Sequence, residues 1–360
     1  MNKRLRALWL FVSLALLLSL TGCLGGLGAD VETAPPIAND SSFAVHFIDV
    51  GQADAALVLC DGKAMLIDGG NRGDGNLIYS YLQKRELTYL DYLVCTHADE
   101  DHVGGLAAAL TYADAGVIYC PVKEYTSDAF NNFVAKAKER GKELTQPTAG
   151  ATFSLGSAQV TVIGPVGEYN DNNNRSIVLR IVYGETSFLF TGDAEREAET
   201  DILASGATLK STVLKVGHHG SESSTTYPFL RAIDPDYAVI SAGKDNKYGH
   251  PTEDVLSRLR DAEVKVYRTD MQGDIICTSD GKTVTFQTQK NGDALTNPTE
   301  QDTAQTEAVT EAEYYVGNVK SKKYHLPICP SLPAEENQKR FSTKQEAIDE
   351  GYDPCGSCKP

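Results

Sequence analysis

The chain has 360 residues, 41% of them hydrophobic, and its formal net charge at pH 7 is −16. This length and apolar content exclude a disordered protein and predict one large domain with additions. The negative charge excludes binding that relies on a broad positive field, so nucleic acid or anionic lipid would have to be held locally.

The first 23 residues are predicted to direct export. A basic start precedes an apolar run at 7–20, which is shorter than a typical membrane-spanning helix. The run ends in Leu-Thr-Gly-Cys at 20–23, which resembles a bacterial lipobox. This resemblance implies that Cys23 becomes a lipidated amino terminus, which anchors a lipoprotein to the extracellular face of the bacterial cell membrane. A plain signal peptide or an uncleaved anchor is the alternative.

Composition divides the rest of the chain into four segments. Residues 24–42 are rich in Gly, Ala and Pro and are expected to form a flexible tether. Strand and helix patterns extend over 43–288. Residues 289–313 hold few large apolar side chains and are expected to be a linker. Residues 314–360 regain aromatic, Cys and His residues and are expected to form a small separate module.

The segment at 43–288 is predicted to be a layered α/β domain. Strand-like runs lie at 43–50, 55–59, 64–67, 92–95, 117–120, 159–163, 177–182, 187–190 and 212–216. Helical patterns lie at 77–84, 129–140, 195–203 and 252–261. Such a mixture is typical of a layered protein rather than a helix bundle or a pure sandwich. Cys60, Cys95, Cys120 and Cys277 are expected to be buried, and a disulfide among them stays open.

Four potential metal ligands follow the strand-like run at 92–95. His97, Asp99, Asp101 and His102 lie within six residues. Side chains packed this densely would repel each other and lose hydration unless a cation compensates. A turn before a helix start can direct His97 and Asp99 to one metal ion and the other pair to a second. Mixed nitrogen and oxygen ligands suit Zn²⁺ or Mn²⁺. An acidic loop with two hydrogen-bonded histidines is the alternative.

The pattern His-x-Asp-x-Asp-His before Gly-Gly resembles the metal motif of the metallo-β-lactamase superfamily, in the form typical of bacterial competence proteins of the ComEC type. Further matching segments are FIDVGQADA at 47–55, IDGG at 67–70, NRSIVL at 174–179, FTGD at 190–193, KVGHHGS at 215–221, YGHP at 248–251 and TD at 269–270 before Gly273. The resemblance implies a four-layer αβ/βα sandwich with two divalent metal ions at the sheet edges.

The resemblance also implies roles for single residues. Asp193 matches the carboxylate that bridges the two metal ions, and His218 or His219 matches a late histidine ligand. Adjacent side chains of an extended chain point to opposite sides, so only one of these histidines is expected to reach the metal. His250 matches a further ligand or a proton donor, with a surface loop residue as the alternative. Asp68 matches an aspartate that orients the metal loop through hydrogen bonds.

One departure from the family concerns the middle of the chain. Many members supply another histidine before the Thr-Gly-Asp segment, but no histidine occurs here at 103–214. The corresponding stretch at 169–174 is rich in asparagine, as it is in the competence-protein branch. The amide oxygen of Asn174 is a weaker ligand than imidazole, so one metal ion could be loosely held or missing.

The leading functional prediction is an extracellular, lipid-anchored phosphodiesterase or nuclease that acts on DNA through metal-activated water. A bound metal ion lowers the pKa of its water and stabilises charge at the attacked phosphorus. Asp99 or Asp101 could orient this water. The alternatives are a hydrolase of a small phosphodiester or ester and a non-catalytic surface lipoprotein that binds DNA. The sequence predicts no specific protein partner.

The C-terminal module contains two close ligand pairs. His325 and Cys329 form the first pair, and Cys355 and Cys358 follow about 25 residues later. A Cys₃His zinc site can stabilise a fold that is too small to build a large core. In an exported chain, a disulfide between Cys355 and Cys358 with Cys329 free is the alternative.

Residues 314–360 resemble the zinc-binding domain of Ada-type DNA repair proteins, which implies a small α+β module with one structural zinc ion. In that family four cysteines bind zinc and one accepts a methyl group. His325 stands at the place of the first cysteine, so methyl transfer is not expected. The basic residues Lys320, Lys322, Lys323 and Arg340 are candidate contacts to phosphate.

Overall fold

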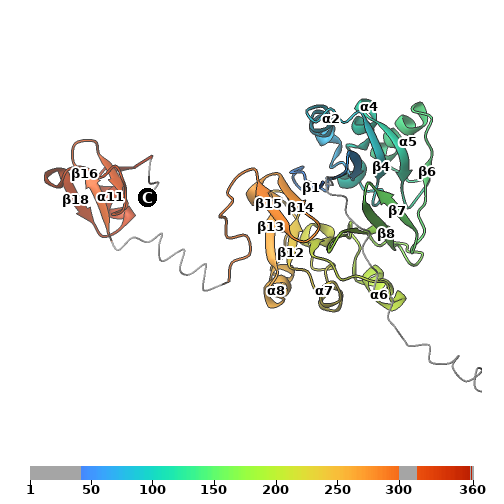
Figure 1. Cartoon of the computed structure of the whole chain (residues 1–360). Helices are drawn as coiled ribbons and strands as arrows, with labels where there is room; N and C mark the ends of the chain where they lie inside the picture. Colours follow the sequence, from blue (N-terminus) through green and yellow to red (C-terminus); the bar gives the residue numbers. More distant parts are fainter. Residues whose placement is uncertain (1–41, 300–313, 357, 359–360) are drawn as a thin grey trace, which may run out of the picture.

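The computed structural model describes residues 42–299, 314–356 and 358, and its larger part is built on two β-sheets (Figure 1). The first sheet has eight strands in the order β15-β14-β1-β2-β3-β4-β5-β6. Its strands are β1 (Phe43–Phe47), β2 (Ala56–Cys60), β3 (Lys63–Ile67), β4 (Tyr89–Val94), β5 (Asp114–Tyr119), β6 (Leu144–Thr145), β14 (Ile275–Ser279) and β15 (Val284–Thr288).

The second sheet has seven strands in the order β13-β12-β11-β10-β9-β8-β7. These are β7 (Thr152–Leu155), β8 (Ala158–Gly164), β9 (Val178–Tyr183), β10 (Thr186–Phe190), β11 (Val213–Lys215), β12 (Tyr237–Ile240) and β13 (Lys265–Arg268). In both sheets the central neighbours β3 and β4, and β10 and β11, are parallel. Their carboxyl ends therefore meet at one edge of each sheet, where α/β proteins commonly bind ligands.

Helices cover the outer face of each sheet. They are α2 (Gly75–Gln83), α3 (Glu100–Val103), α4 (Leu106–Tyr112), α5 (Asp128–Glu139), α6 (Arg196–Ser205), α7 (Tyr227–Ile233), α8 (Glu253–Asp261) and α9 (Thr269–Gln272). In Figure 1, α2, α4 and α5 lie beside the first sheet, and α6, α7 and α8 lie beside the second. The sequence of helix α5 explains why it packs on the sheet. The Ser127 side chain caps the start of the helix, and Phe130, Phe133 and Ala137 form its buried apolar face.

The buried residues separate into three cores in this larger part. One core lies between the sheets and includes Phe47, Phe188 and Phe190. The other two lie between a sheet and its helices, around Leu106 for the first sheet and around Phe229 for the second. Helix, sheet, sheet and helix therefore form four layers, which confirms the predicted αβ/βα sandwich.

The larger domain extends further than the sequence predicted. Thr296 is buried, and its hydroxyl donates to Val266 O at 2.6 Å. Asn297 donates to Leu256 O at 3.0 Å and accepts from Arg260 at 2.7 Å. A linker that starts at residue 289 is therefore wrong for the described residues up to 299. Polar residues attach this segment to α8 and β13 through hydrogen bonds, so low hydrophobicity was a misleading signal.

The C-terminal module has its own sheet, in the order β18-β16-β17-β19. Its elements are β16 (Tyr315–Asn318), β17 (Lys323–His325), the short 3₁₀ helix η4 (Glu335–Asn337), β18 (Gln338–Phe341), α11 (Lys344–Asp349) and β19 (Asp353–Pro354). The apolar core consists mainly of Tyr315, Tyr324, Phe341, Ala347 and Tyr352. So few apolar side chains supply little stability on their own.

Several predictions about the amino-terminal region lie outside the described residues. These include the lipobox, Cys23 and residues 24–41 of the predicted tether at 24–42. Within the described ranges, no helix has the length and apolar character needed to cross a membrane. Cys60, Cys95, Cys120 and Cys277 are buried as expected, and none of them forms a disulfide with a described cysteine.

Candidate metal centre

The predicted ligands gather where four strands of the two sheets end. Asp68 follows β3, His97 follows β4, Asp193 follows β10, and the two adjacent histidines follow β11. Gly192 allows the close approach before Asp193, since its φ is +51° and a Cβ there would lie 2.9 Å from Ser176 Cβ. The site is therefore assembled from both sheets.

One compact group contains Asp101, His102, Asp193 and His219. One ligand atom from each of these residues lies within 4.8 Å of the others. His102 Nε2 lies 3.2 Å from Asp193 Oδ1, and His219 Nε2 lies 3.3 Å from Asp101 Oδ2. His102, Asp193 and His219 are buried, whereas the Asp101 side chain is 33% exposed. Asp101 is therefore the member of this group that faces the open side.

His97 and Asp99 flank the same carboxylate from another side. His97 Nε2 lies 3.5 Å from Asp99 Oδ2 and 4.0 Å from Asp193 Oδ2. The Tyr125 hydroxyl donates to Asp99 Oδ1 at 2.7 Å. Asp193 thus lies between two sets of ligands, as the bridging carboxylate of the family would.

Both adjacent histidines lie close to Asp193, whereas the sequence predicted an extended chain here that points only one of them to the metal. His218 Nε2 lies 3.6 Å and His219 Nε2 lies 3.7 Å from Asp193 Oδ2. The chain is not extended here, because His218 and His219 have φ values of 46° and 54°. The left-handed turn directs both rings toward the same carboxylate. Such conformations cost about 1–3 kcal/mol each and concentrate at functional sites.

Asp68 holds the loop that carries His97 and His102. Its carboxylate accepts hydrogen bonds from Thr96 N and Thr96 Oγ1, both at 2.7 Å, and its Oδ2 lies 2.8 Å from His102 Nδ1. Nε2 of His102 is thereby turned toward Asp193. This geometry agrees with the orienting role predicted for Asp68.

Replacement of Asp68 by asparagine is therefore expected to weaken zinc binding about 10- to 100-fold, since the amide cannot accept from His102 as the carboxylate does. Competition with a chelating dye measures the affinity. Asp91→Asn is a matched control, because Asp91 accepts from Ala64 N on the same sheet. Equal affinities for both variants and the parent would contradict the prediction.

A buried ion pair behind His219 was not predicted. Lys215 Nζ lies 2.7 Å from Asp54 Oδ2, and both side chains are at most 7% exposed. His219 Nδ1 lies 3.1 Å from Ser241 O and 3.3 Å from Asp54 Oδ1. The Ser241 carbonyl therefore accepts from this ring nitrogen and orients the ring, and Asp54 places a negative charge beside it. The signal in the sequence was a lysine inside an apolar strand, which needs a buried carboxylate as partner.

Asn174 supports the turn after Asp193. It is buried, and its amide oxygen accepts from Glu195 N at 3.1 Å and Ala198 N at 3.2 Å, at the start of α6. This oxygen serves the helix start, so the structure does not place it as a ligand. Glu195 Oε1 in turn lies 3.0 Å from His218 Nδ1. Asn174 thus acts on the site indirectly, through Glu195.

His250 lies at the rim of the site. Its ring centroid is 5.6 Å from that of His218, and its Nδ1 lies 3.4 Å from Gln52 Nε2. Burial and the neighbouring charges of His218 and His219 lower the pKa of His250 to about 4. Among the described residues, His250 belongs to no group of ligand atoms within 4.8 Å. His250 therefore lies beside the ligand cluster rather than within it.

The centre fits a divalent metal ion. His97 Nε2, His102 Nε2 and Asp193 Oδ1 are buried, and none of them forms a hydrogen bond within the part of the chain that the structure describes. Buried polar atoms without partners are costly unless an ion satisfies them. Imidazole nitrogen and carboxylate oxygen together suit Zn²⁺ or Mn²⁺.

Metal binding is expected to release protons. Burial lowers the pKa of His219, but the carboxylates of Asp193 and Asp54 outweigh it and raise the pKa to about 10. Without metal this ring is protonated at neutral pH, whereas a ligand nitrogen must be unprotonated, so zinc affinity should rise as pH rises toward 10. Calorimetric zinc titration at pH 7.5 in two buffers of different ionisation enthalpy measures the release. Equal apparent enthalpies would contradict it.

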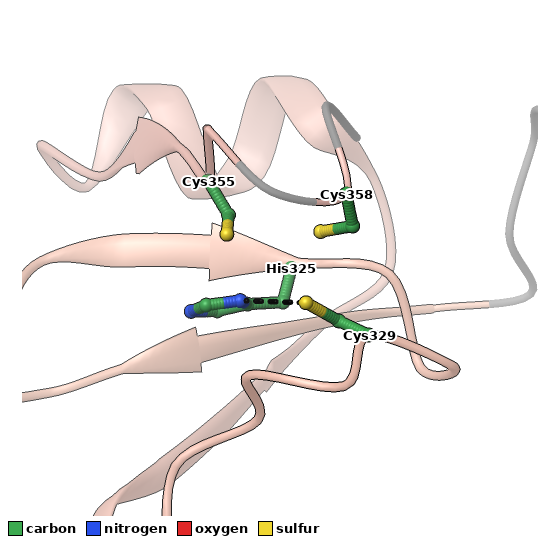
Figure 2. A group of neighbouring side chains, drawn as sticks. All are labelled: His325, Cys329, Cys355 and Cys358. Carbon is green, nitrogen blue, oxygen red and sulfur yellow. Dashed lines mark hydrogen bonds between the residues drawn. The ribbon is translucent and has the colours of Figure 1, made fainter.

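The four ligands predicted in the C-terminal module also lie together (Figure 2). His325 ends β17, and its Nδ1 lies 3.3 Å from Cys329 Sγ in the following turn. Cys355 follows β19, and Cys358 Sγ accepts from Leu326 N at 3.4 Å. One ligand atom from each lies within 4.8 Å of the others, and the described cysteines are free thiols. Three thiols and one imidazole suit zinc.

Sequence comparisons agree with both sites. The profile of the metallo-beta-lactamase superfamily matches residues 48–244, and the profile of the metal binding domain of Ada matches residues 300–360. ComE operon protein 3 of Bacillus subtilis (strain 168) is 33% identical over 64% of this chain and 32% of its own length. Competence protein ComA of Neisseria gonorrhoeae is 33% identical over 69% of this chain and 34% of its own length.

The chain thus spans about a third of the length of these relatives. Among solved structures, the metallo-beta-lactamase fold protein YhfI from Bacillus subtilis aligns with a TM-score of 0.45 and 9% identity. The alignment covers 66% of this chain and 100% of that protein.

Proposed function

The chain belongs to the metallo-β-lactamase superfamily, in its competence-protein branch and with a C-terminal Ada-type metal-binding module, and we propose that it is a metal-dependent phosphodiesterase or nuclease that acts on DNA. The observation that carries this proposal is a cluster of potential ligands around the buried carboxylate of Asp193. The cluster consists of His97, Asp99, Asp101, His102, His218 and His219.

The ligand geometry supports a hydrolytic centre with room for two metal ions. Asp101, His102 and His219 would hold one ion, His97, Asp99 and His218 would hold the other, and Asp193 would contribute to both sets. Bound divalent ions would supply an activated water at neutral pH and stabilise the charge that develops at phosphorus. Asp101 is partly exposed on the open side of the ligand cluster, so its carboxylate can orient the attacking water.

His250 is assigned to the leaving-group side of the reaction. Its ring lies outside the ligand cluster but contacts the His218 ring edge to face, with the two ring centroids 5.6 Å apart. Because its pKa is lowered to about 4, this ring is neutral at neutral pH, and its N–H group can donate a hydrogen bond to a phosphate oxygen. Glu195 and Gln52 hold His218 and His250 respectively, so both rings keep their orientation as substrate enters.

Location and the second module belong to the same proposal. The lipobox resemblance around Cys23 supports an exported lipoprotein, which mass spectrometry of the mature chain can test. The Cys₃His cluster supports one structural zinc ion. Lys320 and Arg340 are exposed on this module and can contact phosphate, which supports a role in holding DNA near the catalytic domain.

The purified full chain, incubated with DNA and either Mn²⁺ or Zn²⁺, tests the proposed function. Metal-dependent cleavage that a chelator stops is the expected result. Hydrolysis of a small phosphodiester without cleavage of DNA would favour the alternative of a small-substrate hydrolase. Retention of DNA without any hydrolysis would favour a non-catalytic surface protein.

A further inference from the structure

A row of aromatic rings leads from the metal ligands to the surface. Tyr248 is 59% exposed, and its ring stacks on His250 with a centroid distance of 5.7 Å and an interplanar angle of 25°. The His250 ring in turn lies 5.6 Å from that of His218. Tyr248 therefore presents an aromatic surface to solvent one ring away from the ligand cluster.

Basic side chains lie on the loop of Tyr248 and in the groove next to His250. Lys247 Nζ lies 4.9 Å from the centroid of the Tyr248 ring. Lys244 and Lys290 line an open groove of about 670 Å³ together with His250. Among the described residues, Lys244 and Lys247 form no ion pair, whereas Arg268 pairs with Asp270 at 2.7 Å and Lys290 lies 3.9 Å from Asp49. Asp245 also lines the groove. Lys244 and Lys247 are therefore the two cations of the Tyr248 loop that are available to a phosphate.

The loop that carries Tyr248 is held in shape before substrate arrives. The side chain of Asn246 donates to Gly243 O at 2.9 Å, and its oxygen accepts from Tyr248 N and His250 N, each at 3.1 Å. One asparagine thus fixes the start, middle and end of the loop. A preformed loop loses little conformational entropy when it binds a ligand.

Exposed aromatic rings next to unpaired cations are the arrangement that binds single-stranded nucleic acid, because bases stack on the rings and phosphates contact the cations. A base inside a duplex is already stacked on both sides, so it cannot lie on Tyr248 unless it is unpaired. We propose that Tyr248, Lys244 and Lys247 form a single-strand platform that seats an unpaired base beside the scissile phosphate. This inference rests on the proposed function and specifies its substrate as single-stranded DNA.

Binding of fluorescein-labelled oligothymidylate by the full chain tests the platform. The strand carries phosphorothioate linkages that resist hydrolysis, so that the chain with its Asp193 intact does not consume it. We expect tighter binding of the single strand than of a duplex of the same length. Tyr248→Ala should weaken single-strand binding about tenfold, and Tyr248→Phe should retain it. Tyr89→Ala is the matched control, because Tyr89 is also exposed, at 50%, but lies at the opposite end of β4 from His97.

Salt dependence adds a second readout. Each of Lys244→Gln and Lys247→Gln should reduce the slope of log affinity against log salt by about 0.7, the value for one single-strand phosphate contact. A merely structural role of the lysines would not change this slope. Unchanged slopes in both variants would contradict their part in the platform.

Hydrolysis of methyl p-nitrophenyl phosphate separates the platform from the proposed function, since this diester has no nucleobase. If the parent chain with Mn²⁺ cleaves neither this diester nor DNA, the proposed function is wrong. The binding measurements still test the platform in that case. Equal binding of single strand and duplex, or undiminished binding by Tyr248→Ala, overturns the platform even if hydrolysis is observed.

Discussion

Replacement of Asp193 by alanine is expected to abolish metal-dependent hydrolysis and most metal binding together. Its two carboxylate oxygens lie within 4.0 Å of ligand nitrogens from His97, His102, His218 and His219. Without this carboxylate both sets of ligands lose their shared member. Activity should fall roughly a thousandfold or more, because water that is not activated by metal keeps a pKa near 15.7 rather than about 7.

Elemental analysis and rate measurements on the same preparation check this expectation. Asp261→Ala is a suitable control, because Asp261 ends α8 on the surface, away from the ligand cluster. Loss of a buried carboxylate among histidines also destabilises the fold by about 3–5 kcal/mol, so the free energy of unfolding should be measured in urea as well. A folded Asp193→Ala chain with full metal content and activity would refute the assignment.

Replacement of Cys355 by serine is expected to unfold the C-terminal module. Cys355 anchors one pair of ligands, and its backbone N donates to Tyr324 O at 2.9 Å. Zinc binding contributes roughly 10–16 kcal/mol in zinc-finger peptides, which far exceeds what the few apolar side chains of this module can supply. Zinc content should fall by about one ion per chain, and protease should cut within 314–358 much faster.

His325→Cys provides the matched variant for this experiment. It gives a Cys₄ set in the same place and should keep both zinc and protease resistance. Mass spectrometry of the parent decides the alternative. A module that is lighter by two hydrogens and free of zinc would mean that Cys355 and Cys358 form a disulfide.

The sequence predicted the parts of the site that depend on local chemistry. His97, Asp99, Asp101 and His102 are close in the chain, and a dense group of ligands after a strand indicates a metal site wherever it occurs. Residue patterns alone predicted a layered α/β domain. The four-layer arrangement followed from the resemblance of the ordered motifs to the metallo-β-lactamase superfamily.

Features that depend on tertiary packing were not predictable in this way. The approach of both His218 and His219 to Asp193 follows from left-handed φ values at two successive residues, which are uncommon outside glycine. The amide oxygen of Asn174 was predicted to be a weak metal ligand. It instead accepts a hydrogen bond from Glu195 N at the start of α6, 21 residues further along the chain. The segment up to Thr299 looked like a linker because its contacts are polar.

The origin of the ligands in both sheets has a consequence for biosynthesis. His97 and His102 follow β4, whereas His219 follows β11, more than one hundred residues later in the chain. A nascent chain that ends between residues 102 and 219 contains only part of the ligand set. An ion that needs ligands from both sheets would therefore be bound only after synthesis has passed residue 219 and the sheets have packed together. The compartment in which folding finishes, rather than the one in which translation begins, would then determine which metal ion is bound.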